Sequence, residues 1–319
     1  MTPTVAWYRE FAPCDALRDD VYAFFSFVPV PRPPLTARPL LREIAFDQPT
    51  FCSPQLADGH VSLLFELGRT CDAAGRWSLG AAPSGAFTGP MSRVGRTAGT
   101  DRPEMLGVYF RPGRAAPFVR VPVADLTDTV AEVESVWRGS ASLASELCEL
   151  DEMSRVDRVE SALLARLALT QRPGSIGVDR MAARMVRRRG RETVESLARG
   201  AGISRQHLSR LFRERVGVGP KLYNRLARFQ AGLIYAGAGT VDWAEAALDL
   251  GYADQSHMIA EVREFSSLTP HALASRQWFH PFIERVREPG TCLASGLGGV
   301  RHEPHELAKH GKNRVSANS

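Results

Sequence analysis

The sequence predicts an α+β fold in three parts: a β-rich N-terminal module, a helical connector and an all-α C-terminal domain with two helix-turn-helix units. Fifteen of the 21 prolines lie in the first 122 of the 319 residues. After residue 122, apolar side chains recur at helical spacing. In the last third of the chain, one pattern of turn and helix occurs twice, with an offset of 49 to 50 residues.

The β-rich module is predicted over residues 1–122. Short apolar stretches, such as VSLLFELG at 61–68 and EMLGVYF at 104–110, are separated there by Gly, Pro and Ser. Such punctuation is typical of short strands joined by turns. With 44% apolar residues in the whole chain, the composition is that of a globular protein with hydrophobic cores.

The helical connector is predicted over residues 123–172, where Val156, Val159, Leu163 and Leu167 recur on one helix face. A linker is predicted at 170–177 and the tandem helical domain at 173–285. Residues 286–319 are rich in Gly, Ser, His and Lys without apolar periodicity, so we expect a disordered tail there.

The positive charge of the chain is concentrated in one segment. Residues 172–230 contain fifteen Lys or Arg and four Asp or Glu, a net charge of +11, whereas the remainder of the chain carries −6. A surface that is merely solvated usually mixes both signs, whereas a concentration of one sign is typical of proteins that bind polyanions. The segment therefore favours a nucleic acid as partner.

The first helix-turn-helix unit is predicted around Gly202, a residue that allows the sharp turn between two helices. Thr193 and Ser204 are suited to cap the helices before and after this turn. In the second helix Leu208, Leu211 and Phe212 share the inner face. The outer face then carries donors spaced by three and four residues: Arg205, Gln206, Ser209, Arg210 and Arg213.

The second unit repeats this pattern after a linking helix at 220–236, which begins with a proline. Gly251 corresponds to Gly202 and Met258 to Leu208, so one residue is inserted in the second turn. Asp254 is the expected cap. The outer positions of the second reading helix are Gln255, Ser256, His257 and Ala260. A linking helix of about 17 residues spans roughly 25 Å, which suits two reading helices about one turn of DNA apart.

The two segments LARGAGISRQHLSRLFRERVGVGP and AALDLGYADQSHMIAEVREFSSLTP resemble the DNA-binding domain of the AraC/XylS transcription regulators. The resemblance covers about residues 178–276. It implies a sequence-specific regulator whose first reading helix makes most base contacts. The stretches LADGHVSLLFELG and GVYFRPG resemble the cupin-like modules joined to such domains, which implies an N-terminal module that senses an effector or dimerises.

Two residues depart from the family pattern. Met258 stands where an aromatic residue is usual, which is a tolerable exchange in a core. Ala260 stands where the family generally has an arginine, so the second helix loses a donor to phosphate or base. We therefore expect the second helix to contribute less to sequence recognition than the first.

The site prediction follows from these positions. Because Arg pairs with guanine and Gln with adenine, base reading is assigned to the first helix, although phosphate contact or simple solvation is the alternative for each residue. The predicted base-reading residues are Arg205, Gln206, Ser209 and Arg210, the second-helix residues are Gln255, Ser256, His257 and Ala260, and the phosphate contacts are Ser204, Arg213 and Arg263.

No catalytic, cofactor or metal site is predicted. His60 lacks a second ligand at suitable spacing, and the five scattered cysteines form no C-x-x-C pair. The alternative is a DNA-repair enzyme delivered by this domain, but Cys14, Cys52, Cys71 and Cys148 are too far apart to match the zinc-binding cysteines of such relatives.

The expected partners are double-stranded DNA, a small-molecule effector, RNA polymerase and a second copy of the chain through the N-terminal module. The longest apolar run, around residues 21–30, is far shorter than the roughly 20 residues of a membrane span. We therefore expect a cytoplasmic protein, associated with the nucleoid and not with a membrane.

Overall fold

The computed structural model describes residues 6–29, 38–46, 56–71, 76–95, 102–170, 177–237 and 242–274. All of them belong to one compact unit, Met1–Pro289. The predicted tail at 286–319 and most of the predicted linker, residues 171–176, lie outside the described ranges. None of the described helices is long and apolar enough to cross a membrane.

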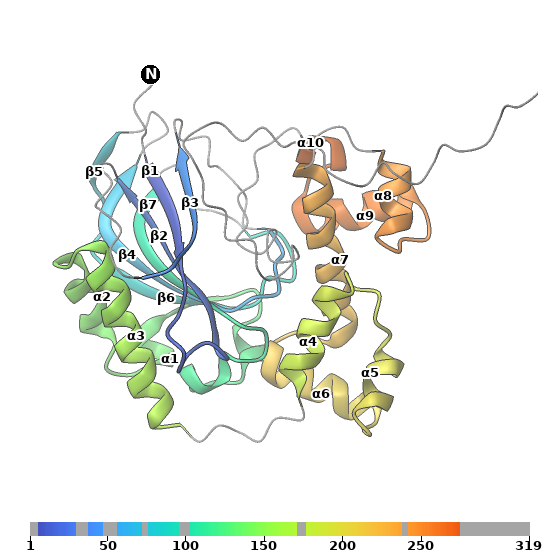
Figure 1. The fold of residues 1–319 in the computed structure, drawn as a ribbon, viewed down its shortest axis with the longest axis horizontal. Helices are drawn as coiled ribbons and strands as arrows, with labels where there is room; N and C mark the ends of the chain where they lie inside the picture. The colour runs from blue at the N-terminus through green and yellow to red at the C-terminus, as the bar shows by residue number, and fades with distance from the viewer. Residues whose placement is uncertain are drawn as a thin grey trace, which may run out of the picture. The chain divides into compact units, whose positions relative to one another are not determined.

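The N-terminal part forms one antiparallel sheet, which confirms the prediction of a β-rich module (Figure 1). Its strand order is β3-β1-β2-β7-β4-β6-β8, and β5 pairs with β4. The strands are β1 (Ala6–Phe11), β2 (Val21–Pro29), β3 (Leu40–Phe46), β4 (Ser62–Cys71), β5 (Trp77–Leu79), β6 (Ser84–Thr88), β7 (Arg102–Phe110) and β8 (Val130–Glu132).

The alternation of side chains explains the strands that the sequence predicted. In β4, Leu63, Phe65 and Leu67 are buried, whereas Glu66 between them is exposed. In β7, Gly107 lies against the ring of Phe25, where a Cβ atom would come within 2.0 Å of a ring carbon. A larger residue at this position would displace the Phe25 ring.

Residues 123–172 are more than a connector, because they complete the sheet module. They form the 3-10 turn η2 (Val123–Leu126), strand β8, and the helices α1 (Val133–Val136), α2 (Ala141–Cys148) and α3 (Glu152–Ala168). Val156, Val159 and Leu163 of α3 are buried in the same hydrophobic cluster as the sheet. The spacing correctly predicted the helix but not its partner, since amphipathic periodicity does not say which surface covers the apolar face.

The C-terminal part is helical. It consists of α4 (Val178–Arg187), α5 (Val194–Gly200), α6 (Arg205–Val216), α7 (Pro220–Gly237), α8 (Trp243–Asp249), α9 (Gln255–Ser266) and α10 (Pro270–Ala274). As expected, Pro220 begins α7, where the missing N–H of proline costs no helical hydrogen bond. Leu226, Phe229 and Leu233 of α7 are buried in the core of this part.

A short segment ahead of β4 joins the helical core. Leu56 and Ala57 are buried in the same hydrophobic cluster as Phe229 and Phe265. The Ala57 N–H donates to the carbonyl of Phe265 over 3.3 Å, and the Gln230 side chain donates to the carbonyl of Asp58 over 2.6 Å. Residues distant in sequence thus complete the helical core, which the predicted domain boundaries of 1–122 and 173–285 do not anticipate.

The carboxyl group of Asp58 makes the stability of this contact depend on pH. Burial raises its pKa from 3.8 to about 7, although the N–H groups of His60 and Met91 donate to it. The folded protein therefore holds a proton that the unfolded chain releases, so its stability falls as pH rises from about 4 to about 7. Asp58→Asn should remove this loss.

We expect Asp58→Asn to raise the free energy of unfolding at pH 8 by on the order of 1–3 kcal/mol, a range that allows for the partial exposure of the residue. At pH 4 the substitution should change the free energy of unfolding little. Urea unfolding at both pH values measures the difference. Asp151→Asn is the control of opposite sign, because hydrogen bonds from Ser154 and Met153 lower the pKa of Asp151. An Asp58→Asn effect that is the same at pH 4 and pH 8 would contradict the prediction.

Candidate nucleic-acid interface

The first helix-turn-helix unit consists of α5, a turn at Gly202 and α6. Gly202 has a φ of 65°, the left-handed conformation expected at the end of the first helix. The Thr193 hydroxyl accepts a hydrogen bond from the Ser196 N–H over 3.0 Å, and the Ser204 hydroxyl accepts one from the His207 N–H over 3.1 Å. Both caps predicted from the sequence are therefore present, and together they fix where α6 begins.

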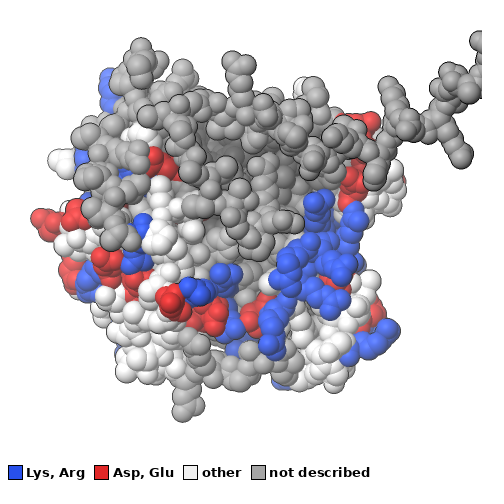
Figure 2. All heavy atoms as spheres, viewed as in Figure 1, with Lys and Arg blue, Asp and Glu red and all other residues white. Residues whose placement is uncertain are grey.

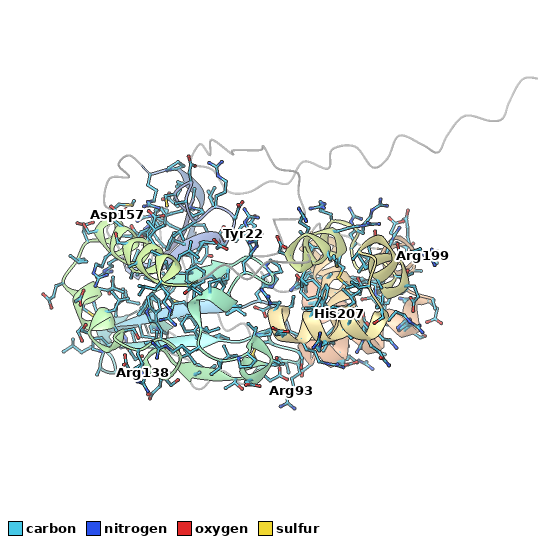
Figure 3. All side chains as sticks on the ribbon, turned by 90° about the horizontal axis from the view of Figure 1, so that it is seen from below. Tyr22, Arg93, Arg138, Asp157, Arg199 and His207 are labelled. Carbon is cyan, nitrogen blue, oxygen red and sulfur yellow. The ribbon has the colours of Figure 1, made fainter. Side chains whose placement is uncertain are left out.

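The inner face of α6 holds the helix against the core. Leu208, Phe212 and Val216 are buried, and the ring of Phe212 meets that of Tyr223 edge-on at 6.1 Å. The outer positions Arg205, Gln206, Arg210 and Arg213 are exposed, whereas Ser209 and His207 are half-buried. Figure 3 labels His207 on α6 and Arg199 on the neighbouring α5. The structure thus brings the predicted first-helix residues onto one helix, with Ser209 the least accessible.

One of these residues already has a partner. The Arg205 guanidinium donates to the Glu195 carboxylate over 2.9 Å, and this hydrogen bond lowers the pKa of Glu195. Both side chains are more than half exposed, so the ion pair contributes little to stability. To contact a base, the Arg205 side chain must either break its ion pair with Glu195 or keep this ion pair while it binds the base. The repeat pattern gave no signal for this pair, because Glu195 lies on the other helix of the unit.

The second unit has the same construction. Gly251 has a φ of 78°, and the Asp254 carboxylate accepts from the His257 N–H over 2.7 Å, as predicted for the cap. Met258 is buried, so the exchange of an aromatic residue for Met is accommodated in the core. The outer positions of α9, all exposed, are Gln255, Ser256, His257, Ala260 and Arg263.

Helix α7 connects the two units, and its 18 residues span about 27 Å. Glu261 of α9 is buried between two arginines of α7. Its carboxylate oxygens lie 2.8 Å from the Arg225 Nε atom and 3.2 Å from the Arg228 Nε atom. This cluster fixes the second unit on α7. Sequence reasoning missed it, because these charges have the same appearance in the sequence as exposed ones.

No group of three or more His, Cys, Asp or Glu side chains in the described ranges is arranged to hold a metal ion. Cys14 and Cys148 are free thiols, and the structure does not describe the side chains of Cys52 and Cys71. The assignments of single residues to bases and phosphates remain predictions.

Two family models match separate parts of the chain. Residues 197–276 match a family described as "Helix-turn-helix domain", and residues 9–132 match one described as "Domain of unknown function (DUF6597)". The first match begins inside α5 and covers the rest of the first helix-turn-helix unit and all of the second. The second covers the sheet as far as β8. No curated protein matches the chain.

Solved structures with similarity to the chain include AraT from Geobacillus stearothermophilus and ToxT from Vibrio cholerae. The C-terminal domain of AraT, a response regulator from Geobacillus stearothermophilus, is 18% identical over 35% of this chain and 93% of its own, with a TM-score of 0.31. Apo ToxT K231A from Vibrio cholerae is 9% identical over 70% of this chain and 90% of its own, with a TM-score of 0.39. ToxT with a bound unsaturated fatty acid is 9% identical over 86% and 97%, with a TM-score of 0.35.

Proposed function

We propose that this chain is a DNA-binding transcription regulator that reads its DNA site unequally with the two units of its helix-turn-helix domain, which resembles that of the AraC/XylS regulators. The first reading helix, α6, would make most base contacts through Arg205, Gln206, Ser209 and Arg210. The second, α9, would add fewer through Gln255, Ser256 and His257. Ser204, Arg213 and Arg263 would contact phosphates.

The observation that carries this proposal is the difference between the outer faces of the two helices. On α6, Arg205, Arg210 and Arg213 are exposed. On α9, the exposed arginine is Arg263, and Ala260, which is also exposed, offers no hydrogen-bond donor. Since base recognition in the major groove needs hydrogen-bond donors and acceptors on the reading helix, the first half-site should carry more sequence information. Selection of bound sites from random duplex DNA by the full chain tests this, and equal information in both half-sites would contradict it.

Replacement of Arg210 by Ala should weaken binding to the selected site by about 1–3 kcal/mol and relax the preference at one or two base pairs. The reason is that a bidentate contact to a guanine edge is lost. Titration of labelled duplexes that carry each base at the affected positions measures both effects. Arg199→Ala is the control, because Arg199 is an exposed arginine on α5, outside the reading helix. Equal losses for the two variants would argue against base reading by Arg210.

Replacement of Ala260 by Arg should tighten binding, because it supplies a cation on the exposed face of α9. If the new side chain reaches a phosphate, the slope of log K against log salt should steepen by about 0.9. Titrations at several salt concentrations measure this slope. Ala260→Gln, a polar side chain without charge, should leave the slope unchanged. Weaker binding by Ala260→Arg would show that this position does not face the duplex.

We further propose that the sheet module takes a small-molecule effector or dimerises, with 1–122 as its sensor part, 123–172 as the segment that completes it and leads to the helical part, and 173–285 as DNA-binding domain. One of the similar ToxT structures has an unsaturated fatty acid bound, but for this chain no ligand class follows. Sedimentation of the full chain with and without its selected DNA tests dimerisation. If the chain sediments as a monomer at all concentrations, both free and on DNA, dimerisation is excluded and effector binding is the remaining proposed role of the module.

The alternative function is DNA repair by an enzyme that uses the same domain for delivery. It would need a metal-bound group of cysteines, and the zinc content of the purified chain discriminates between the two functions. We expect no stoichiometric zinc. One tightly bound zinc ion per chain would favour the enzyme.

A further inference from the structure

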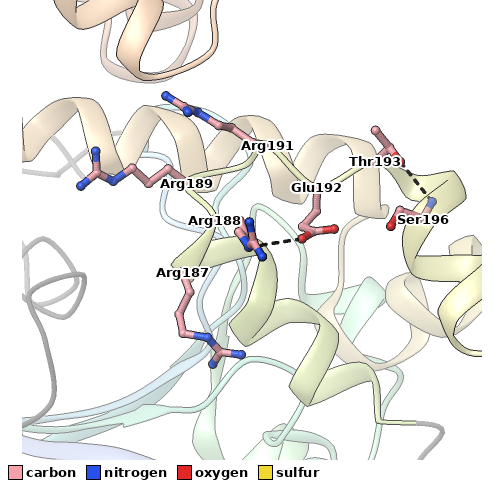
Figure 4. A pocket seen from close by; sticks show the side chains of 7 residues that line it. All are labelled: Arg187, Arg188, Arg189, Arg191, Glu192, Thr193 and Ser196. Atoms are coloured by element: carbon pink, nitrogen blue, oxygen red, sulfur yellow. Dashed lines mark hydrogen bonds and ion pairs between the residues drawn. The ribbon is translucent and has the colours of Figure 1, made fainter.

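A second group of arginines lies outside both reading helices. They are all exposed and are here called the arginine loop: Arg187, the last residue of α4, and Arg188, Arg189 and Arg191, which lie between α4 and α5. Together with Glu192, Thr193 and Ser196 they line an open groove of about 400 Å³ (Figure 4). Figure 2 shows Lys and Arg gathered in a patch over the region of α4 and α7.

The backbone of the arginine loop packs against α7 and is hydrogen-bonded to α4. Gly190 has a φ of 70°, and a Cβ atom there would lie 2.1 Å from the carbonyl oxygen of Asn224, so only glycine fits. The Asn224 side chain in turn donates to the carbonyl of Glu192. The N–H groups of Arg189 and Gly190 donate to carbonyls in the last turn of α4, at 2.8 and 2.9 Å. The backbone positions of the four arginines are therefore fixed before a ligand binds, which lowers the entropy lost on binding.

The charges of the arginine loop are only partly balanced. Glu192 is paired with Arg184 at 2.8 Å and lies 3.7 Å from Arg188. Within the described part of the chain, neither Arg187 nor Arg191 forms an ion pair. Several guanidinium groups around one open groove, with one mostly buried carboxylate among them, attract an anion with several charged oxygen atoms.

The position of the groove connects it with both helix-turn-helix units. Arg191 lies against the turn of the second unit, since a Cβ atom on Gly251 would come within 3.3 Å of its Cγ and Nε atoms. On the other side, the first turn of α5 supplies Thr193 and Ser196 to the groove and Glu195 to Arg205, the first residue of α6. The groove therefore lies between the start of the first unit and the turn of the second.

We propose that the arginine loop binds phosphate groups of the DNA backbone between the two half-sites. This inference rests on the proposed DNA binding. When two reading helices enter successive major grooves on one face of a duplex, the intervening stretch turns its minor groove and the flanking phosphates towards the protein. Arg187, Arg189 and Arg191 meet these phosphates, and the Thr193 and Ser196 hydroxyls add donors. Such contacts strengthen binding without reading sequence.

The test uses the full chain in which Arg187, Arg189 and Arg191 are all replaced by Gln. Binding to the selected site and to an unrelated duplex should weaken by the same factor, on the order of tenfold or more at moderate salt, and the slope of log K against log salt should decrease by up to about 2.7. The preference for the selected site over the unrelated duplex should not change. The control has the same change of net charge in the sheet module: Arg93, Arg120 and Arg138 replaced by Gln.

The outcomes separate this inference from the proposed function. If the wild-type chain shows no preference among duplexes, the proposed function fails. If it shows a preference but the loop variant binds with unchanged affinity and slope, or loses no more than the control, only the arginine loop is excluded. Calorimetry with sodium triphosphate provides a further arm. Saturable binding of triphosphate, lost in the loop variant, together with unchanged DNA binding would assign the groove to a free phosphate ligand and overturn the inference.

Discussion

Replacement of Phe212 by Ala should lower the free energy of unfolding by about 3–5 kcal/mol and abolish specific DNA binding. Phe212 is fully buried on the inner face of α6 and meets Tyr223 of α7 edge-on. The smaller side chain leaves a cavity where α6 packs on α7, so the reading helix loses the contact that fixes its orientation. Urea unfolding followed by circular dichroism, and titration with the selected duplex, measure the two effects.

The repeat within the domain supplies a matched control for this prediction. Val262 occupies on α9 the position that Phe212 occupies on α6, and it is also buried. Val262→Ala removes two methyl groups, so we expect a loss of about 1.5–2.5 kcal/mol and a smaller loss of DNA affinity. If Phe212→Ala unfolded no more easily than Val262→Ala, the core of the first unit would be less tightly packed than the structure indicates.

Local signals in the sequence predicted the helical domain well. Thr193, Ser204 and Asp254 act as caps, and Gly202 and Gly251 adopt the left-handed conformation expected between the helices. These features depend on hydrogen bonds and backbone angles within a few residues, so they can be predicted without knowledge of the fold. The β-rich N-terminal part was predicted in the same way, from turn residues between short apolar runs.

Contacts between distant residues could not be predicted. Leu56 and Ala57 enter the helical core from a segment that precedes β4, and the Asp58 carbonyl accepts from Gln230. Nothing in the sequence of this segment distinguishes it from other short apolar segments that precede a strand. For the site, periodicity placed Arg205 on the outer face correctly, but its partner Glu195 depends on the crossing of α5 and α6. The arginine loop was visible only as part of the net charge, because its groove requires Gly190 to fold against Asn224.

The charged cluster between α7 and α9 is another contact between distant residues that could not be predicted from the sequence, and its loss should cost more free energy of unfolding. Glu261 has a side chain that is 1% exposed, and it accepts hydrogen bonds from Arg225 and Arg228. Burial alone would lower the pKa of Arg225, but hydrogen bonds to Glu264 and Glu261 outweigh burial and raise it. Such a cluster is stable only as a whole, because each charge that loses its partner stays buried without compensation.

Replacement of Glu261 by Ala should therefore lower the free energy of unfolding by about 3–5 kcal/mol, since two partly buried guanidinium groups lose their shared carboxylate. Glu264→Ala is the matched control: Glu264 also pairs with Arg225, at 2.5 Å, but its side chain is 53% exposed, so its loss should cost less than about 1 kcal/mol. Chemical unfolding of the full chain measures both.

Because the cluster fixes α9 on α7, Glu261→Ala should also weaken contacts to the second half-site more than those to the first. Binding to duplexes with one or the other half-site scrambled distinguishes the two. If Glu261→Ala and Glu264→Ala proved equally mild, solvent would reach Arg225 and Arg228 in the folded protein, and the second unit would be fixed on α7 by its apolar contacts alone.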